Sequence, residues 1–255
     1  TTGNQNIAIG HNAINGGTTT GDNNIAIGAS AGDALTSGNG AVFIGKDAGG
    51  AVTTAGGWSG TIIGHQAGTA IVNAEIVAIG RKAAYQLGGS GYGDGSTVIG
   101  TRAGETLGQS VGNLTLVGHK AGNALTVSSG STFVGANAGM NVTTGNNNIA
   151  MGLTAMGVAA TTGDNNIAIG ASAGDALTSG YDNIMMGKDA GGAITTALGN
   201  IAIGANALDA ATTGLHSNIA IGANTMGVTT GADFVIAIGN HAGGGGNMTS
   251  DADGT

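Results

Sequence analysis

The sequence predicts an all-β fold, a parallel β-solenoid in which one short repeat follows another as successive turns. Two observations predict it. A three-residue word of mainly apolar residues followed by glycine recurs fourteen times along the 255 residues, and the chain has 54 glycines, no proline and only 3% aromatic residues. A core with so few aromatic side chains must be thin and built from small residues. A solenoid buries such a core continuously.

Other glycine-rich classes are excluded by the same composition. Collagen requires glycine at every third residue together with proline, and this chain has neither feature. A disordered coil is incompatible with an apolar fraction of 41%. The absence of cysteine excludes a disulfide-stabilised scaffold.

The charge balance narrows the possible partners. The formal net charge is −8, with only six Lys and Arg residues, whereas nucleic-acid binding needs clustered cations to neutralise phosphates. No run approaches the roughly 20 apolar residues of a membrane span, and no signal peptide opens the chain. We therefore expect no nucleic-acid partner and no membrane insertion by this segment. The repeat is already under way at the first residues, so we expect a fragment of a longer fibre.

The repeat is one continuous array over residues 1–255. Its glycines are Gly10, Gly28, Gly45, Gly64, Gly80, Gly100, Gly118, Gly135, Gly152, Gly170, Gly187, Gly204, Gly222 and Gly239. Their spacings run from 16 to 20 residues, which predicts about 14 turns of 17–18 residues. A block of twenty residues, 19–38, recurs unchanged at 161–180, an offset of 142 residues or eight repeats. Duplication of blocks therefore built the array.

The three residues before each glycine predict a short strand, as in Ile7, Ala8 and Ile9. Neighbouring side chains of a strand point to opposite faces, so the first and third residues share one face and the middle residue has the other. We expect the first and third to face the interior and the middle column to face outward. That middle column is apolar in every copy: Ala8, Ala26, Phe43, Ile62, Ala78, Val98, Leu116, Phe133, Ala150, Ala168, Met185, Ala202, Ala220 and Ala237.

Two apolar faces predict self-association, because a single solenoid has one interior and the second face must be covered. Repeated small residues that let backbones approach favour identical chains around a shared axis, and we expect a homotrimer. The alternative is a flattened solenoid whose outer Ala column is merely tolerated. Phe43, Leu116 and Phe133 in that column weigh against it.

The residues after the glycine predict two corners and a second strand. Ala occupies the third position after the glycine in thirteen copies and Gly the fourth in nine, which permits a sharp corner. An apolar residue at the seventh position, such as Leu35, predicts a second short strand in each turn. Asn before the strand, as at Asn24, and the TTG words mark the other corner, where stacked side chains can bond between turns.

The words NIAIGxxAG and DNNIAIGASAG, the latter at residues 22–32 and 164–174, resemble the head repeats of trimeric autotransporter adhesins. They are also similar to the NNIAIG and TTG repeats of phage tail-fibre proteins. The resemblance covers essentially the whole chain. It implies a trimeric, left-handed parallel β-roll. Nothing resembles an autotransporter stalk or anchor, which favours a phage or virion fibre.

No catalytic constellation stands out from the repeat, so we expect no enzyme, no cofactor and no metal site. The segment 40–47 approaches a phosphate loop, but Asp47 stands where Ser or Thr should hold the metal. Irregular insertions are better candidates for recognition, and they carry Trp58 and Tyr92. All basic residues and three histidines follow the strand glycine, which predicts a basic edge. The histidines of that edge are His11, His65 and His119.

The function expected from these features is that of a structural fibre or adhesion segment, on a virion or otherwise extracellular, that spaces or presents host-attachment surfaces. Its partners would be further copies of itself and a host cell-surface glycan or protein receptor. The first alternative is the head domain of a bacterial trimeric surface adhesin. A more distant one is an ice- or ligand-binding β-solenoid, to which the TTG columns point. The histidine edge and the two aromatic residues are the possible contact residues.

Overall fold

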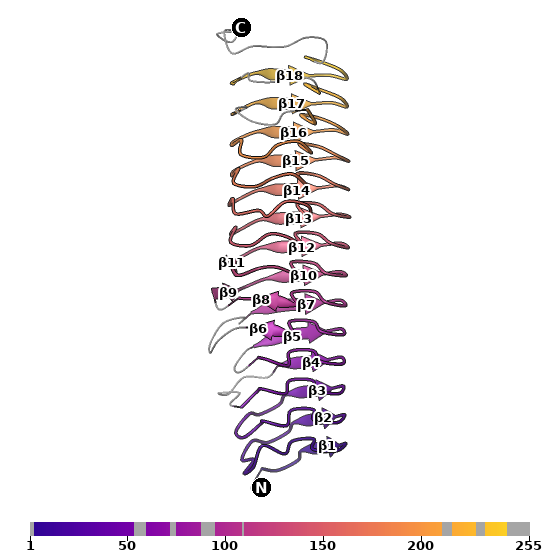
Figure 1. Cartoon of the computed structure of the whole chain (residues 1–255), viewed down its shortest axis with the longest axis vertical. Coiled ribbons are helices and arrows are strands. Elements are labelled where there is room, and N and C mark those ends of the chain that lie inside the picture. Colours follow the sequence, from indigo (N-terminus) through magenta and orange to yellow (C-terminus); the bar gives the residue numbers. More distant parts are fainter. Residues whose placement is uncertain are drawn as a thin grey trace. The chain divides into compact units, whose positions relative to one another are not determined.

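A computed structural model describes residues 3–53, 60–71, 75–87, 95–108, 110–210, 216–227 and 233–243, and these residues form an all-β parallel β-solenoid (Figure 1). The chain divides into two compact units, Thr1–Gly130 and Ser131–Thr255. The described residues contain no helix, and hence none that could cross a membrane. The predicted fold class is therefore confirmed at this level.

In the first unit, each repeat contributes one strand to a parallel sheet, and each strand pairs with that of the next repeat. The pairing joins equivalent positions, as Ile7 with Ile25 and Ala8 with Ala26. The strands, in their order in the sheet, are β1 (Ile7–Ile9), β2 (Ile25–Ile27), β3 (Val42–Ile44), β4 (Thr61–Ile63), β5 (Ile76–Ile79), β7 (Ser96–Ile99) and β10 (Thr115–Val117). Side chains of one repeat position therefore form columns.

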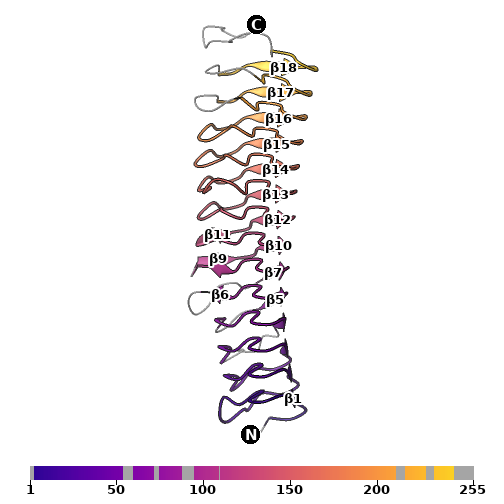
Figure 2. The same ribbon diagram turned by 45° about the vertical axis from the view of Figure 1, so that its right-hand side comes forward.

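The second unit repeats this arrangement. Met185, for example, pairs with Ala168 on one side and with Ala202 on the other. Its strands, in their order in the sheet, are β12 (Thr132–Val134), β13 (Ile149–Met151), β14 (Ile167–Ile169), β15 (Ile184–Met186), β16 (Ile201–Ile203), β17 (Ile219–Ile221) and β18 (Ile236–Ile238). Figure 2 shows these strands stacked along one side of the unit, with the return segments opposite them.

The expected second strand in each turn is wrong for most of the described turns. Two-stranded parallel ladders form in only two places, both in the first unit. They are β6 (Gln86–Leu87) with β8 (Thr106–Leu107), and β9 (Ser110–Gly112) with β11 (Val127–Ser129). Elsewhere in the described ranges a large apolar residue at the seventh position is buried, as Leu35 and Ile194 are, but lies outside a strand.

The expectation about which strand face is inside is also wrong. Every described middle residue except Ala8 has an exposed fraction of 7% or less, so the middle column fills the interior. The first and third residues face outward and are half-buried or exposed, as in the Ile201–Ile203 strand with its pattern of half-buried, buried and exposed residues. The middle column supplies one side chain per strand to the interior, and these side chains range in size from Ala202 to Phe43 and Phe133. The other two side chains of each strand must therefore point out.

Left-handed backbone makes the corner after each strand. The second residue after the strand glycine has a positive φ in every turn, from Asn12 at 58° to His241 at 59°. The strand glycine itself has φ of 135° at Gly28, and a Cβ there would lie 2.6 Å from the carbonyl oxygen of Gly45 in the next turn. Glycine is required here both by its φ and by the close stacking of consecutive turns.

The large side chain that fills the interior comes from different positions of the repeat in different turns. Where the fourth residue after the strand glycine is Gly, a large residue occupies the middle or the seventh position. At Gly174, for example, a Cβ would lie 2.7 Å from Cε of Met185. Met156, Leu208 and Met226 are large residues at the fourth position and are fully buried, and in the turn of Met156 the seventh residue after the strand glycine is the small Ala159. Each turn thus reaches a similar packing density with different side chains.

A buried asparagine precedes most strands of the second unit and forms a ladder between turns. Asn166 donates its side-chain Nδ2 to Oδ1 of Asn148 at 3.2 Å, and Asn183 donates in the same way to Asn166 at 3.0 Å. Asn200 and Asn218 continue the ladder at 3.1 Å and 3.2 Å. The predicted side-chain bonding between turns is therefore present, and it satisfies amides that are otherwise cut off from water.

Candidate functional site

The outward sheet face of each unit is an extended apolar surface of the described structure. We use this name for the first and third residues of the sheet strands; β5 and β7 begin one residue earlier. In the second unit these residues are Thr132, Val134, Ile149, Met151, Ile167, Ile169, Ile184, Met186, Ile201, Ile203, Ile219, Ile221, Ile236 and Ile238. Only the first of them is polar. The strand register stacks them into two continuous apolar columns.

Exposure on this face is substantial for such large side chains. The exposed fractions of Ile203, Met186 and Met151 are 36%, 38% and 40%, although each has strand neighbours on both sides. Covering apolar surface contributes roughly 25 cal/mol for each Å² removed from water. Soluble monomers rarely leave a continuous apolar patch of this kind uncovered. The face therefore has the properties of a surface that binds another apolar surface.

In the first unit the outward sheet face carries more threonine. It consists of Ile7, Ile9, Ile25, Ile27, Val42, Ile44, Thr61, Ile63, Val77, Ile79, Thr97, Ile99, Thr115 and Val117. The register again aligns equivalent positions, as Thr97 with Thr115. Threonine retains a methyl group at this position, so the columns stay largely apolar.

The predicted contact residues fall into two groups. His11, His65 and His119 are all exposed and lie one residue after the strand glycine. Three turns separate each from the next, which is about 14 Å at the spacing of parallel strands, so the structure does not bring them together. Trp58 and Tyr92 lie outside the described residues. The histidines thus mark an edge of the first unit without forming a common site.

The basic residues also follow the strand glycine, and five of the six lie in the first unit. Three of them occupy the left-handed corner position in three consecutive turns: Lys82, Arg102 and Lys120, with φ of 58°, 59° and 55°. We call these three residues the basic ladder. Backbone bonds hold it in register, since the Arg102 N–H donates to the Arg81 carbonyl at 2.9 Å and the Lys120 N–H to that of Thr101 at 3.0 Å.

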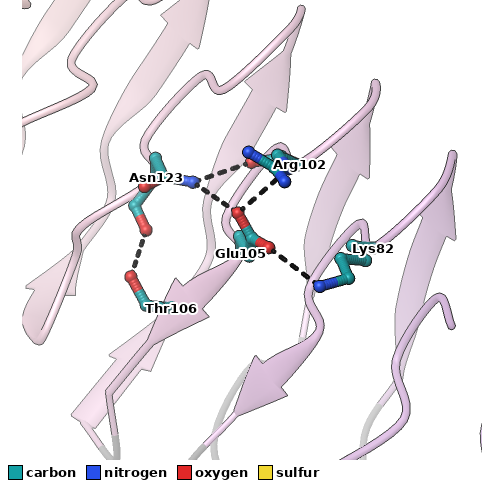
Figure 3. Close-up of polar contacts among 5 residues, drawn as sticks. All are labelled: Lys82, Arg102, Glu105, Thr106 and Asn123. Carbon is teal, nitrogen blue, oxygen red and sulfur yellow. Dashed lines mark hydrogen bonds and ion pairs between the residues drawn. The ribbon is translucent and has the colours of Figure 1, made fainter.

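Glu105 organises the basic ladder (Figure 3). Its carboxylate lies 3.6 Å from Nζ of Lys82 and 3.6 Å from Nε of Arg102, and only 18% of its side chain is exposed. Asn123 of the following turn donates its Nδ2 to the Arg102 carbonyl at 3.2 Å and to Glu105 at 3.5 Å. Thr106 donates its hydroxyl to the Asn123 carbonyl at 2.5 Å. One carboxylate thus positions two cations on neighbouring turns.

The basic ladder and the adjacent Arg81 carry more positive charge than Glu105 compensates. Nζ of Lys82 also stands 4.7 Å from the centre of the Tyr85 ring, a cation–π contact. Arg81 is exposed, and neither Arg81 nor Lys120 has an ion-pair partner among the described residues. By contrast, Lys46 forms an ion pair with the adjacent Asp47 at 2.7 Å.

Sequence reasoning identified the basic edge but not the basic ladder on three consecutive turns. Alignment of the repeats on the second position after each strand glycine reveals that ladder.

Carboxylates gather at one corner of the second unit. A Cβ on Gly192 would lie 2.9 Å from Oδ1 of Asp209 and 3.7 Å from Oδ1 of Asp175. Burial, and next the charge of Asp189, raise the pKa of both Asp175 and Asp209 above the ordinary aspartate value of 3.8. Asp189 itself forms an ion pair with Lys188. The corner therefore holds more negative charge than its neighbours neutralise.

The equivalent corner of the first unit has Asp33 and Asp47, each 142 residues before its counterpart. In place of the third aspartate it has Thr69, which like Asp209 lies five residues after its strand glycine. This corner forms a hollow of about 260 Å³ lined by Ser30, Asp33, Asp47, Gly50, Ala51 and Thr69. Thr69 donates its hydroxyl to the Asp47 carbonyl at 3.0 Å. Nowhere in the described ranges do three or more His, Asp or Glu side chains meet in a group that could hold a metal ion.

Threonine hydroxyls of the TTG and TSG words bond between turns. Thr36 donates to the Thr53 carbonyl at 2.7 Å, and Thr178 donates to the Thr195 carbonyl at 2.9 Å. Thr161 donates to the Leu177 carbonyl at 2.7 Å. These donors hold consecutive turns together and are not available to an external ligand such as ice.

Comparison of the chain with protein-family models, with curated proteins and with solved structures gives no significant match to any of them.

Proposed function

We propose that this chain is a structural segment of a phage tail fibre or other virion fibre, which spaces or presents host-attachment surfaces outside the cell and catalyses no reaction. In that fibre, three copies pack their outward sheet faces around a common axis. Each copy is a left-handed β-roll of about fourteen turns, one for each strand glycine. The observation that carries the proposal is the pair of continuous, partly exposed apolar columns along the strands of each unit.

The width of the face supports three copies. Packed sheets stand about 10 Å apart, so each backbone lies about 5 Å from the plane or axis that it shares with its partners. Three faces at that distance enclose a triangular prism with sides of about 17 Å, the span of about five extended residues. A strand of three residues, as in Ile167–Ile169, together with its two flanking residues supplies this number of residues. Outward Ile and Val side chains then fill the prism.

The purely repetitive organisation supports a spacer over an enzyme. Equivalent residues recur from turn to turn, whereas a catalytic site needs a unique arrangement of groups. Repeats of this kind create extended surfaces whose binding properties vary along the array. A fibre uses both properties, since it provides length and displays different side chains at different heights.

The experiment is a mass measurement in solution by light scattering or sedimentation. One chain has a mass of 24.0 kDa, and we expect three times this value. Ile203→Asp places a charge in the centre of the outward sheet face of the second unit and should dissociate the assembly. Ser179→Asp adds the same charge at an exposed position in a TSG word and should leave the mass unchanged. A single-chain mass for the unaltered protein would refute the assembly.

A further inference from the structure

We propose that the basic ladder, Lys82, Arg102 and Lys120, together with the adjacent Arg81, binds an acidic polysaccharide chain through its carboxylate or sulfate groups. The inference rests on the proposed function, because it assigns a ligand class to one attachment surface of the fibre. The ladder lies on three consecutive turns whose strands are β5, β7 and β10, all in the first unit.

The placement of these residues points to a ligand. The left-handed corner position favours Asn and Asp, whose short side chains tolerate a positive φ. Nine of the other turns have Asn, Asp, Ser or Gln there, among them Asn137, Asp189 and Asn206. Lys and Arg occupy the position only in these three turns. Like charges on directly neighbouring strands repel one another, so the ladder lowers stability in the absence of a counter-ion.

The spacing suits a linear polyanion. Parallel strands lie about 4.8 Å apart, so the ladder offers one cation per step along the direction in which turns stack. Glu105 compensates one charge of the Lys82 and Arg102 pair and holds both side chains in place. The remaining excess is three positive charges, counting Arg81 and Lys120. Guanidinium groups bind carboxylate and sulfate oxygens through paired hydrogen bonds, and Arg102 has 38% of its side chain exposed.

A polysaccharide fits the surface better than a nucleic acid does. The net charge of the chain is −8, which repels any polyanion outside this small patch, so the charge alone does not separate the two ligand classes and the lack of a stacking platform decides between them. Among the described residues of this edge, the Tyr85 ring is the only aromatic surface on which a base could stack, and that ring already faces Lys82. A polysaccharide with isolated acidic groups requires only local cations and no stacking platform.

The test measures binding of the full chain to immobilised heparin, alginate, neutral dextran and single-stranded DNA over a range of salt concentrations. We expect salt-sensitive binding to heparin or alginate and none to dextran. The double variant Arg81→Glu, Lys120→Glu should weaken that binding by at least about tenfold. Lys188→Glu reverses a cation at the position equivalent to Arg81 in the second unit, and it should leave binding unchanged.

Measurement of the mass of the same samples separates loss of polysaccharide binding from loss of assembly. Unaltered binding by the double variant, or equal binding to DNA, overturns the inference. Loss of assembly in the double variant with its thermal unfolding otherwise intact also overturns it, because the ladder then faces a neighbouring copy. Charge-dependent polysaccharide binding by a chain of single mass supports the ladder and refutes only the trimeric fibre.

Discussion

Asn183 donates its side-chain Nδ2 to Oδ1 of Asn166 at 3.0 Å, and the same oxygen accepts the backbone N–H of Asn183 at 3.1 Å. Oδ1 of Asn183 in turn accepts the backbone N–H and the Nδ2 of Asn200, at 3.0 Å and 3.1 Å. Each amide therefore satisfies two donors of the following turn. All three side chains are fully buried, so no water can replace a missing partner.

Replacement of Asn183 in the asparagine ladder should lower stability by more than the loss of one hydrogen bond does. Asn183→Leu removes the acceptor of the Asn200 backbone N–H and one acceptor of its Nδ2, and we expect the free energy of unfolding to fall by about 2–4 kcal/mol. Asn183→Ser should cost about half as much, because a serine can accept the backbone bond. Ser131 does so in this chain, accepting the N–H of Asn148 at 3.1 Å. Chemical denaturation measures both losses, and equal losses would contradict the acceptor role.

Met185 and Met186 are neighbours in β15 and test which strand face is inside. Met185 is fully buried, whereas 38% of Met186 is exposed. Met185→Ala should lower the free energy of unfolding by about 2–5 kcal/mol, because it opens a cavity between Gly174 and Gly191. Met186→Ala should act mainly through association, so its effect on thermal unfolding should depend on protein concentration. A larger concentration-independent loss for Met186 would mean that the faces are reversed.

Thr154 has a left-handed backbone with φ of 55°, although a β-branched residue is poorly suited to it. Thr154→Asn should raise the free energy of unfolding by about 0.5–1 kcal/mol. Asn206, at the same position in its turn, shows that the replacement can bond to its neighbour, since its Nδ2 donates to Oδ1 of Asn224 at 3.1 Å. Differential scanning calorimetry tests this, and a lower unfolding temperature would show that the Thr154 contact with Ser172 outweighs the backbone strain.

The aspartate corner of the second unit should make stability depend on pH. Because the folded-state pKa values of Asp175 and Asp209 lie above 3.8, protonation of these groups stabilises the fold. This contribution is fully present below pH 3.8 and is lost as the pH rises through the raised pKa values. Asp189→Asn removes a charge that raises both, so it should increase stability at neutral pH by at most about 1 kcal/mol and flatten the pH profile.

The duplicated block provides the control for this prediction. Asp47→Asn changes the equivalent residue of the first unit, which has φ of 58° and is likewise preceded by a lysine. There Thr69 stands in place of the third aspartate. The stabilisation at neutral pH and the change in pH profile should both be smaller than for Asp189→Asn. Equal effects would show that the repulsion among the three aspartates of the second unit does not cause the pKa shifts.

The sequence by itself determined the solenoid fold, the positions of its strands and the pairing of equivalent residues in neighbouring repeats. A glycine such as Gly28 recurs every 16 to 20 residues because only glycine permits both its φ and its contact with the next turn, so the period is visible in the sequence. The asparagine ladder was predictable for a similar reason. An amide repeated before successive strands can bond to its equivalents in the neighbouring turns.

Only the tertiary structure decided which face of the strand is inside. The alternation of side chains along the strand shows that Ile201 and Ile203 share a face and that Ala202 lies on the other. Because both faces are apolar, the sequence pattern does not show which of them is buried. The left-handed corner residues set the direction of the chain after each strand, and this direction encloses the middle column. Sequence reasoning placed the first and third residues inside, whereas the structure buries the middle residue, whether it is Ala202 or Phe133. The same corner brings Lys82, Arg102 and Glu105 together from different repeats.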